Sequence, residues 1–402
     1  MLSLYLLTLA ICAVAVVASP PVVRRNSPIT LPFAKVISTT GTRSIVERDR
    51  TRYNALRAQA KTTTSQDQAT NASANNTLVS YVINVGVGSP PELFNLIIDT
   101  GSSNTWVGAD ITHPYVPPFS SLTGETMGAV YGSGQFSGPA VKVDITIGSL
   151  QVSDQIIGSA VEAFGFNDGV DGILGIGPTG LTKGSLFPDE SATIPTGNNL
   201  IPEHLFAVSF EPATSNPELN GELTFGGIDD SKFTGSITYT PITSTSPASQ
   251  YWGIDQSISY GTTAILSQGS GIVDTGTSLI GLASDLFSVY QTATGGILDP
   301  ATGLLTVTEE QYANLGDLTF TIGGTDFDLT PNAQIWPRSL NSAIGGESGI
   351  IYLVVINLGT PSGFDMDFIN GQAFLERFYS VFDTANSQVG IATTPFTNAE
   401  TN

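Results

Sequence analysis

Two aspartates, Asp99 and Asp274, follow aliphatic runs and stand in nearly the same short motif. Residues 96–103 read LIIDTGSS and residues 271–278 read GIVDTGTS, so the aspartates lie 175 positions apart, about the length of one domain. A carboxylate at the end of a buried strand is costly unless it is paired or hydrogen-bonded. An ordinary turn is one alternative, since Asp, Gly and Ser favour turns. Two copies with the same apolar approach instead indicate two related lobes.

If the lobes pack about a pseudo-two-fold axis, Asp99 and Asp274 meet at their seam. Two neighbouring carboxylates cannot both ionise cheaply, so the pair holds one proton and titrates in two separate steps. The ionised member can take a proton from a bound water while the protonated member polarises a carbonyl group. Attack by this water gives a tetrahedral diol, and its breakdown cleaves an amide without a metal or a covalent intermediate. The pattern therefore predicts peptide-bond hydrolysis with Asp99 and Asp274 as the catalytic residues.

The residues beside both aspartates suit this chemistry. Gly101 and Gly276 permit tight turns and let backbone amides approach the carboxylates. Hydroxyl groups can donate hydrogen bonds to the outer carboxylate oxygens or across the seam between the loops; they belong to Thr100, Ser102, Thr275 and Thr277. Ordinary turn chemistry is the alternative reading for each hydroxyl taken singly.

The elements that must position these residues are mainly short strands. Segments of four to eight residues alternate or run apolar between Gly, Pro, Asn and Ser breaks; they include 81–88, 94–99, 141–148, 205–210, 221–227 and 271–276. Helical spacing occurs at 44–61 and in a few short stretches such as 284–293 and 371–379. The echo also continues downstream, since ILG at 173–175 follows the first motif and ING at 369–371 follows the second. The sequence predicts an all-β protein with two homologous lobes.

Composition removes several other classes of hydrolase. The only cysteine is Cys12, so the chain after it has no disulfide and no thiol nucleophile. Only His113 and His204 are present, with no HExxH pair, and no serine stands in a G-x-S-x-G motif. Both histidines are expected at the surface. Metal-dependent and serine hydrolysis therefore lack their usual residues, and we expect no cofactor and no metal.

The first residues resemble a secretory signal. Residues 2–18 are apolar apart from Ser3 and Thr8, and they end before Ser19 and Pro20, which predicts a signal peptide over 1–18. A membrane anchor is the alternative, although about 17 residues is the short limit for spanning a bilayer. We therefore expect an extracellular protein without stable membrane association.

Charge divides the remaining chain in two. Residues 19–77 hold nine basic and three acidic residues, a net charge of +6, whereas residues 78–402 carry −27. A basic arm can bind nucleic acid, but behind a signal peptide it is better explained as a pro-segment lying on an acidic body. Residues 62–77 are polar and read as a linker with two glycosylation acceptors, Asn71 and Asn75. The sequence predicts a glycosylated zymogen. Its pro-segment is expected to be released by acid between about pH 5 and 3, when carboxylates protonate.

Residues 78–395 resemble the pepsin-like aspartic endopeptidases. The motifs that carry the resemblance occur in the family's order: DTGSSNTW, YGSG, DGILGIG, DTGTS and RFYSVFDTANSQVGIA. The lack of disulfides and the acidic composition are closest to the secreted fungal members. The resemblance implies a bilobal fold, with one lobe over 78–238, the other over 239–402, and an active cleft between them. It also implies polypeptide substrates, pepstatin-type inhibitors, the chain's own pro-segment as a partner, and a monomer.

The family's other site residues can be carried over to matching positions. Tyr131, Gly132 and Ser133 would form a flap that binds substrate, although a YGSG hairpin is otherwise only a turn. Trp106 would hold the Tyr131 hydroxyl. The resemblance also assigns Gly101, Gly276 and Thr277 to substrate binding and gives supporting roles to Thr100, Ser102, Thr275 and Ser278.

Two departures from the family stand out. Asn370 and Gln372 replace the usual aliphatic residue and acid around the glycine of the second motif, which makes the pH optimum harder to predict. The family's pro-segment lysine, which pairs with the dyad, has only Lys35 and Lys61 as candidates. Ser133 stands where some fungal relatives carry an acid that accepts lysine. With a cleft lined by residues such as Phe136 and Ile280, we expect large apolar side chains around the scissile bond.

Two rival interpretations follow from the same resemblance. A binding or inhibitor protein on this fold would be expected to lack an aspartate, a flanking glycine or the flap tyrosine, all of which are present. A vacuolar protease differs only in location. The sequence therefore favours a secreted aspartic endopeptidase active in acid.

Overall fold

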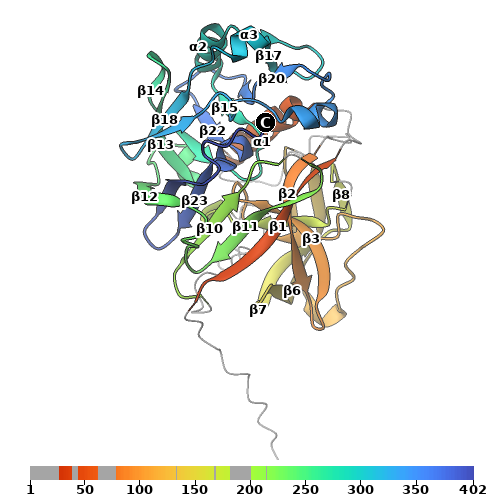
Figure 1. Ribbon diagram of the computed structural model, residues 1–402. Helices are drawn as coiled ribbons and strands as arrows, with labels where there is room; N and C mark the ends of the chain where they lie inside the picture. Colours follow the sequence, from red (N-terminus) through yellow and green to blue (C-terminus); the bar gives the residue numbers. More distant parts are fainter. Residues whose placement is uncertain are drawn as a thin grey trace, which may run out of the picture.

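The computed structural model describes residues 27–38, 44–61, 78–132, 134–166, 169–181, 201–213 and 215–402. The predicted signal peptide (1–18), the linker (62–77) with Asn71 and Asn75, and Ser133 lie outside these residues. Strands predominate, and the all-β, bilobal prediction is confirmed. Figure 1 shows the strands of residues 253–370 above and the N-terminal strands below, with helix α1 (Ile45–Lys61) between them. The strands within 234–241 and 378–393 lie beside the N-terminal strands.

One large sheet joins the two halves of the chain. Among the described residues it has 14 strands, and β8 (Glu162–Phe164) pairs with β6 off the main path. The spatial order is β12 (Thr234–Pro241), β24 (Gln388–Thr393), β23 (Phe378–Asp383), β10 (Leu205–Phe210), β11 (Glu218–Phe225), β1 (Ile29–Ser38), β2 (Leu78–Val87), β3 (Glu92–Asp99), β9 (Gly172–Gly175), β4 (Trp106–Val107), β7 (Leu150–Ser159), β6 (Gln135–Ile147) and β5 (Leu122–Val130). The predicted lobe boundary at 238/239 falls inside β12 and stays a prediction.

The C-terminal half adds two smaller sheets and short helices. The first sheet has the order β19 (Thr325–Leu329), β18 (Leu318–Ile322), β13 (Gly253–Tyr260), β14 (Thr263–Val273), β22 (Phe368–Asn370), β15 (Ile280–Leu282) and β21 (Val355–Asn357). The second contains β16 (Ile297–Leu298), β17 (Leu305–Val307) and β20 (Ile351–Tyr352). The helices are α2 (Ser284–Thr294), α3 (Glu309–Tyr312) and α4 (Gln372–Leu375).

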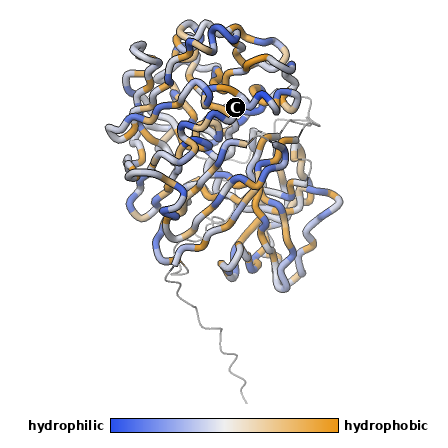
Figure 2. The backbone as a smooth tube through the Cα atoms, viewed as in Figure 1, coloured by the Kyte–Doolittle hydropathy of each residue, from blue (hydrophilic) through white to orange (hydrophobic). Residues whose placement is uncertain are grey.

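The alternation of apolar and polar residues explains the strands. β18 buries Leu318, Phe320 and Ile322 and leaves the intervening threonines half-exposed, as expected for a strand with one face on the core. Strands such as β9 and β10 are buried throughout. Figure 2 shows hydrophobic residues running along the strands.

The predicted helix over 371–379 is only partly correct. It ends after one turn as α4, and the aromatic, β-branched run that follows forms β23. The N-terminal segment, defined here as residues 27–38 and 44–61, also contributes a strand that was not anticipated. β1 pairs antiparallel with both β11 and β2, so it lies inside the large sheet. None of the helices in the described residues is long and apolar enough to cross a membrane.

Candidate active site

The two DTG motifs occupy equivalent positions in the two lobes. Asp99 ends β3, which pairs in parallel with β9, and Asp99 lies opposite Gly175. Asp274 directly follows β14, which pairs in parallel with β22, and Val273 lies opposite Asn370. The sequence echo between 173–175 and 369–371 therefore reflects the strand that supports each aspartate.

The two loops are held together by a symmetric pair of threonines. The Thr100 amide donates to Thr275 Oγ1 and the Thr275 amide donates to Thr100 Oγ1, both at 3.0 Å. Each hydroxyl then donates to a carbonyl of the opposite strand, Thr100 Oγ1 to Val273 and Thr275 Oγ1 to Ile98. These reciprocal bonds fix the spacing of the loops, as the sequence predicts.

Equivalent donors surround the two buried carboxylates. Ser102 Oγ donates to Asp99 Oδ2 at 2.5 Å, and Thr277 Oγ1 donates to Asp274 Oδ2 at 2.6 Å. The amide two residues after each aspartate donates to its other oxygen, at 3.0 and 3.1 Å respectively. The predicted hydroxyl contacts are confirmed, and they leave the Oδ1 oxygens facing the seam.

Glycine is required at the turn after each aspartate. A Cβ atom built on Gly101 would stand 2.7 Å from Asp274 Oδ1, and one built on Gly276 would stand 2.6 Å from Asp99 Oδ1. Both distances are shorter than real carbon–oxygen contacts. Any side chain there would push the two loops apart.

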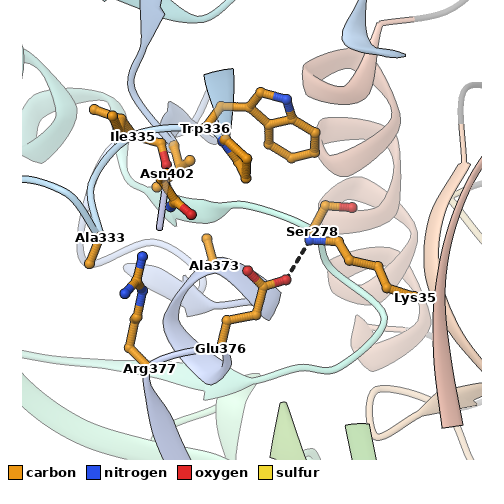
Figure 3. Close-up of a pocket in the computed structure, with 11 residues that line it drawn as sticks. Lys35, Ser278, Ala333, Ile335, Trp336, Ala373, Glu376, Arg377 and Asn402 are labelled. Carbon is orange, nitrogen blue, oxygen red and sulfur yellow. Dashed lines mark hydrogen bonds and ion pairs between the residues drawn. The ribbon is translucent and has the colours of Figure 1, made fainter. Parts of the chain in front are cut away.

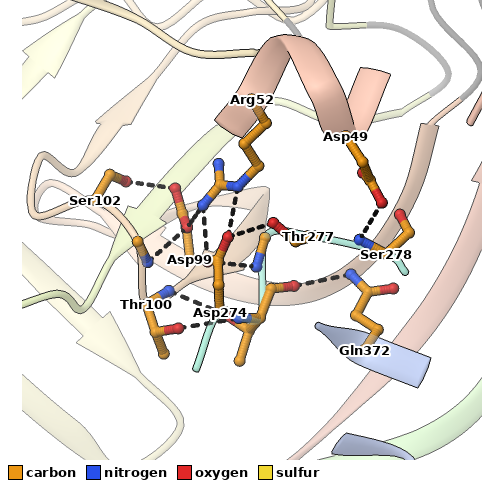
Figure 4. A network of polar contacts seen from close by, with 12 residues as sticks. Asp49, Arg52, Asp99, Thr100, Ser102, Asp274, Thr277, Ser278 and Gln372 are labelled. Atoms are coloured by element: carbon orange, nitrogen blue, oxygen red, sulfur yellow. Dashed lines mark hydrogen bonds and ion pairs between the residues drawn. The ribbon is translucent and has the colours of Figure 1, made fainter. Parts of the chain in front are cut away.

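Arg52 of α1 binds both carboxylates at once (Figure 4). Its Nη2 atom lies 2.5 Å from Asp99 Oδ1 and 2.8 Å from Asp274 Oδ1, and its Nε lies 2.7 Å from Asp274 Oδ2. The planar guanidinium therefore makes a two-pronged contact with Asp274 and a single contact with Asp99. A single guanidinium from the N-terminal segment therefore bridges the two neighbouring carboxylates.

Burial and charge oppose each other in this cluster. Burial alone would raise the pKa of Asp274, but the Arg52 charge and hydrogen bonds from Arg52, Thr277 and Gly276 lower it below its ordinary value. Burial alone would lower the pKa of Arg52, but both aspartates raise it well above its usual range. Arg52 and Asp274 therefore stabilise each other's charged forms in this state.

In the described residues Arg52, and not the candidate Lys35, contacts the dyad. Lys35 Nζ instead lies 2.5 Å from Glu376 Oε1 (Figure 3). Lys61 is the last residue of α1, and its side chain lies outside the described part. Arg52 was missed because the family pattern directed attention to lysine. Its signal was present, since Arg48 and Arg52 stand four residues apart on one face of a predicted helix.

Other residues of α1 fasten the helix to the C-terminal motif. The Asp49 carboxylate accepts hydrogen bonds from the amides of Ser278 and Leu279 at 3.0 and 2.8 Å. Arg48 donates to the carbonyls of Val79 and Gly276. Burial raises the pKa of Asp49, although Arg48 and the two amides act in the opposite direction. The helix thus occupies backbone groups beside the dyad as well as the dyad itself.

The predicted flap is the hairpin between β5 and β6. Trp106 Nε1 donates to the Tyr131 hydroxyl at 3.0 Å, as predicted, and burial raises the pKa of Tyr131. A Cβ built on Gly132 would lie 2.0 Å from Arg52 Cα, so this turn packs directly on α1. Ser133 lies outside the described residues. Of the two expected subsite residues, Phe136 stacks on Trp106 with ring centroids 4.2 Å apart, while Ile280 is fully buried in β15.

The two departures from the family form amide hydrogen bonds, although Gln372 Oε1 is buried without a hydrogen-bond partner. Asn370 and Gln256 exchange bonds between their side chains at 2.9 and 3.3 Å. Gln372 Nε2 donates to the carbonyl of Thr275 at 2.8 Å, next to Asp274. Neutral amides therefore support the second loop where the family pattern has an acid.

The two histidines lie away from the dyad. His113 is partly exposed, contacts Asp171 and Glu92, and stacks on Phe94. The carbonyl of His204 accepts a hydrogen bond from the amide of Thr384 at 3.0 Å. Within the described residues no group of His, Cys, Asp and Glu side chains has the spacing of a metal site.

Comparison with known proteins agrees with this site. The family model for eukaryotic aspartyl proteases matches residues 80–394. The chain is 57% identical over 336 residues to polyporopepsin from Irpex lacteus, which covers 82% of this chain and 98% of that protein. It is 33% identical over 333 residues to gastricsin from Cavia porcellus, which covers 78% of this chain and 80% of that protein.

A solved structure gives the same result. The crystal structure of the aspartic proteinase from Irpex lacteus matches with a TM-score of 0.78 and 51% identity, covering 94% of this chain and 100% of that one. Fold, site and comparisons together define an aspartic endopeptidase, a hydrolase that acts on peptide bonds. The chain belongs to the pepsin-like aspartic protease family.

Proposed function

We propose that this protein is a secreted zymogen whose mature form cleaves internal peptide bonds in acid, with Asp99 and Asp274 as the catalytic pair. The observation that carries the proposal is the guanidinium of Arg52 bound to both carboxylates. A cation in this position binds both members of the pair and occupies the space beside their inner oxygens. The described arrangement therefore corresponds to an inhibited form.

Catalysis begins once Arg52 has left. The pair then holds one proton, because two adjacent carboxylates do not both ionise readily. A water between Asp99 and Asp274 loses a proton to the ionised member and attacks the peptide carbonyl, which the protonated member polarises. Protonation of the amide nitrogen completes cleavage of the resulting diol. The donors on the outer oxygens, Ser102 and Thr277, hold the carboxylates in place through these steps.

Substrate takes the position that α1 holds in the zymogen. The amides of Ser278 and Leu279, which bind Asp49 here, become donors for substrate carbonyl oxygens. Tyr131 and Gly132 close over the peptide from the other side, and Trp106 keeps the tyrosine hydroxyl oriented. Gly101 and Gly276 leave room for the peptide beside the dyad. Substrates are polypeptides with large apolar side chains around the scissile bond, and pepstatin-type inhibitors compete with them.

Acid releases the N-terminal segment as a pro-segment. Residues 19–77 and 78–402 carry net charges of +6 and −27, so they attract each other near neutrality. Lowering the pH protonates carboxylates of the body while arginine and lysine stay charged. The same change brings the dyad to its one-proton state, so release and activation coincide. Cleavage within 62–77 then separates the segment and can remove Asn71 and Asn75 with it.

The sequence best supports a protein that is secreted and monomeric. Residues 1–18 have the pattern of a signal peptide, and the acidic body repels nucleic acid and anionic membrane. Vacuolar protease A from Neurospora crassa is 31% identical over 330 residues, covering 78% of each chain, which keeps a vacuolar location as the alternative. Secretion of the intact precursor by its own host, detected in culture medium, separates the two.

One experiment tests the proposal as a whole. Purified precursor is incubated with a denatured protein from pH 2 to 7, with and without pepstatin, and its new N-terminus is sequenced over time. The proposal predicts pepstatin-sensitive cleavage that appears only after acid treatment. A precursor that is fully active at pH 7 with residues 19–61 attached would contradict the zymogen mechanism. A processed protein that binds pepstatin but cuts nothing would support the rival binding or inhibitor role.

A further inference from the structure

Helix α1 makes a second ion pair with the C-terminal lobe beyond the dyad. Arg57 Nη2 lies 2.8 Å from Asp365 Oδ2. The Asp365 side chain is only 2% exposed, whereas the Arg57 side chain is 30% exposed. A carboxylate covered by a basic side chain of the inhibitory helix marks a position where the body of the enzyme accepts positive charge.

The surroundings of Asp365 accept side chains of α1 more generally. The Tyr53 hydroxyl forms a hydrogen bond with Thr360 Oγ1 at 2.5 Å. Tyr53 and Leu56 also pack against one apolar wall. The apolar residues of this wall come from the C-terminal lobe; they include Tyr251, Leu358, Met366 and Ile369. The neighbouring carboxylate of Asp367 accepts hydrogen bonds from the amides of Ser270 and Gly363.

The distance along α1 relates this contact to the scissile bond. Arg52 marks the dyad, and Arg57 follows five positions later, which is about 7.5 Å along a helix at about 1.5 Å per residue. An extended peptide advances about 3.3 Å per residue, so the same distance corresponds to two or three substrate residues. A side chain that replaces Arg57 would therefore lie outside the two residues that flank the cut.

We propose that Asp365 is a specificity-determining residue, which selects substrates with an Arg or Lys two or three positions from the scissile bond. The inference rests on the proposed function of the dyad and adds to it. The apolar preference next to the cut and the basic preference further away concern different positions, so they do not compete. The pairing of Arg57 with Asp365 shows the charge and geometry that such a substrate would reproduce.

The test compares three mature enzymes: wild type, Asp365→Asn and Asp326→Asn. The control residue Asp326 is exposed on β19 and bonds to Thr321 of the same sheet, so it shares the lobe and the charge but does not contact α1. Each enzyme digests the same peptide library at pH 5, and the residues at every position around the cuts are counted. Pairs of synthetic peptides that differ only by Arg or Met at the enriched position then give ratios of kcat/KM.

Wild type and Asp326→Asn should show the same enrichment of Arg and Lys at one position two or three residues from the cut. The Arg peptide should exceed the Met peptide by about threefold to tenfold in kcat/KM, as expected for an ion pair with one sheltered partner. Asp365→Asn should cut the library at the same apolar positions and lose this ratio. Cleavage by wild type without basic enrichment, or enrichment retained in Asp365→Asn, would overturn the inference and leave the proposed function intact. Absence of cleavage by all three enzymes would reject both.

Discussion

Arg52 and Asp274 face each other as a planar fork against a planar carboxylate. Nε and Nη2 of the arginine lie 2.7 and 2.8 Å from Oδ2 and Oδ1 of the aspartate. The same Nη2 continues to Asp99, so one guanidinium serves both lobes. A lysine ammonium is a single point charge and cannot reproduce this geometry. Arginine therefore gives the N-terminal segment a firmer hold on the dyad than the lysine that the family pattern predicts.

Replacement of Arg52 should make the precursor accessible at higher pH. Asp274 has a lowered pKa in the docked state, so its bond to Arg52 stabilises docking at pH values above its ordinary 3.8 and is lost as the pH falls through the lowered value. Arg52→Ala removes this bond to Asp274, and Arg52→Lys weakens it. Binding of a fluorescent pepstatin probe to the precursor should therefore begin at higher pH in the order wild type, Lys, Ala.

Arg50→Ala is the matched control for this series. Arg50 lies on the same helix and donates to the carbonyl of Asn357, but it does not reach the dyad. Its probe-binding profile should stay close to that of wild type. If Arg50→Ala and Arg52→Ala shifted the profile equally, general loss of basic charge would explain release and the role of Arg52 would be wrong.

The dyad and its support were predictable because they depend on local motifs. Apolar runs ending in DTG located Asp99 and Asp274, and the hydroxyl spacing located Ser102 and Thr277. The contribution of the N-terminal segment was less visible, because β1 gains its place only by pairing with strands from distant parts of the chain. Asn370 departs from the family pattern, and its partner Gln256 could not be identified from the local motif because it lies 114 residues away.

Trp106 and Tyr131 should act as one unit in the mature enzyme. Trp106→Phe removes the indole donor and leaves the tyrosine hydroxyl without this partner, which costs about 1–3 kcal/mol for a buried group. We expect kcat/KM to fall about tenfold in Trp106→Phe and in Tyr131→Phe, and the double variant to lose little more. Trp252→Phe, which removes an indole bond to the carbonyl of Ile176, should combine with Tyr131→Phe additively. Independent, multiplying effects of Trp106 and Tyr131 would show that the hydrogen bond does not orient the flap.

Lys35 and Glu376 should be strongly coupled in the precursor. The pair is buried at 2.5 Å, and the Tyr81 hydroxyl also donates to Glu376. Lys35→Met leaves a buried carboxylate without its cation and should lower the free energy of unfolding by about 3–5 kcal/mol. The double variant Lys35→Met, Glu376→Gln should recover most of that loss, as measured by denaturant unfolding.

The control for this pair is Lys232, whose contact with Glu222 is partly exposed. Lys232→Met should cost less than about 1 kcal/mol. Equal losses at Lys35 and Lys232, or a double variant no more stable than Lys35→Met, would contradict a buried and coupled pair.

Gly276 should tolerate no side chain. A methyl group at this position would collide with Asp99 across the seam, whereas one at Gly180 would meet no atom within 4 Å. Gly276→Ala should therefore lower the kcat/KM of the mature enzyme by at least about 100-fold through displacement of the carboxylates. Gly180→Ala should keep kcat/KM within about twofold of wild type, because the added methyl group meets no neighbouring atom. Near-normal activity of Gly276→Ala would show that the loops are not held as closely as described.

The most direct measurement of the central claim is the peptidase turnover of mature Asp99→Asn and Asp274→Asn. Each change keeps the size of the side chain and removes one member of the proton-sharing pair, so kcat should fall by at least about 100-fold while circular dichroism stays unchanged. The account predicts this loss for both variants separately. A folded variant that retains about a tenth of the wild-type turnover at any pH from about 2 to 7 would contradict catalysis by the Asp99–Asp274 pair.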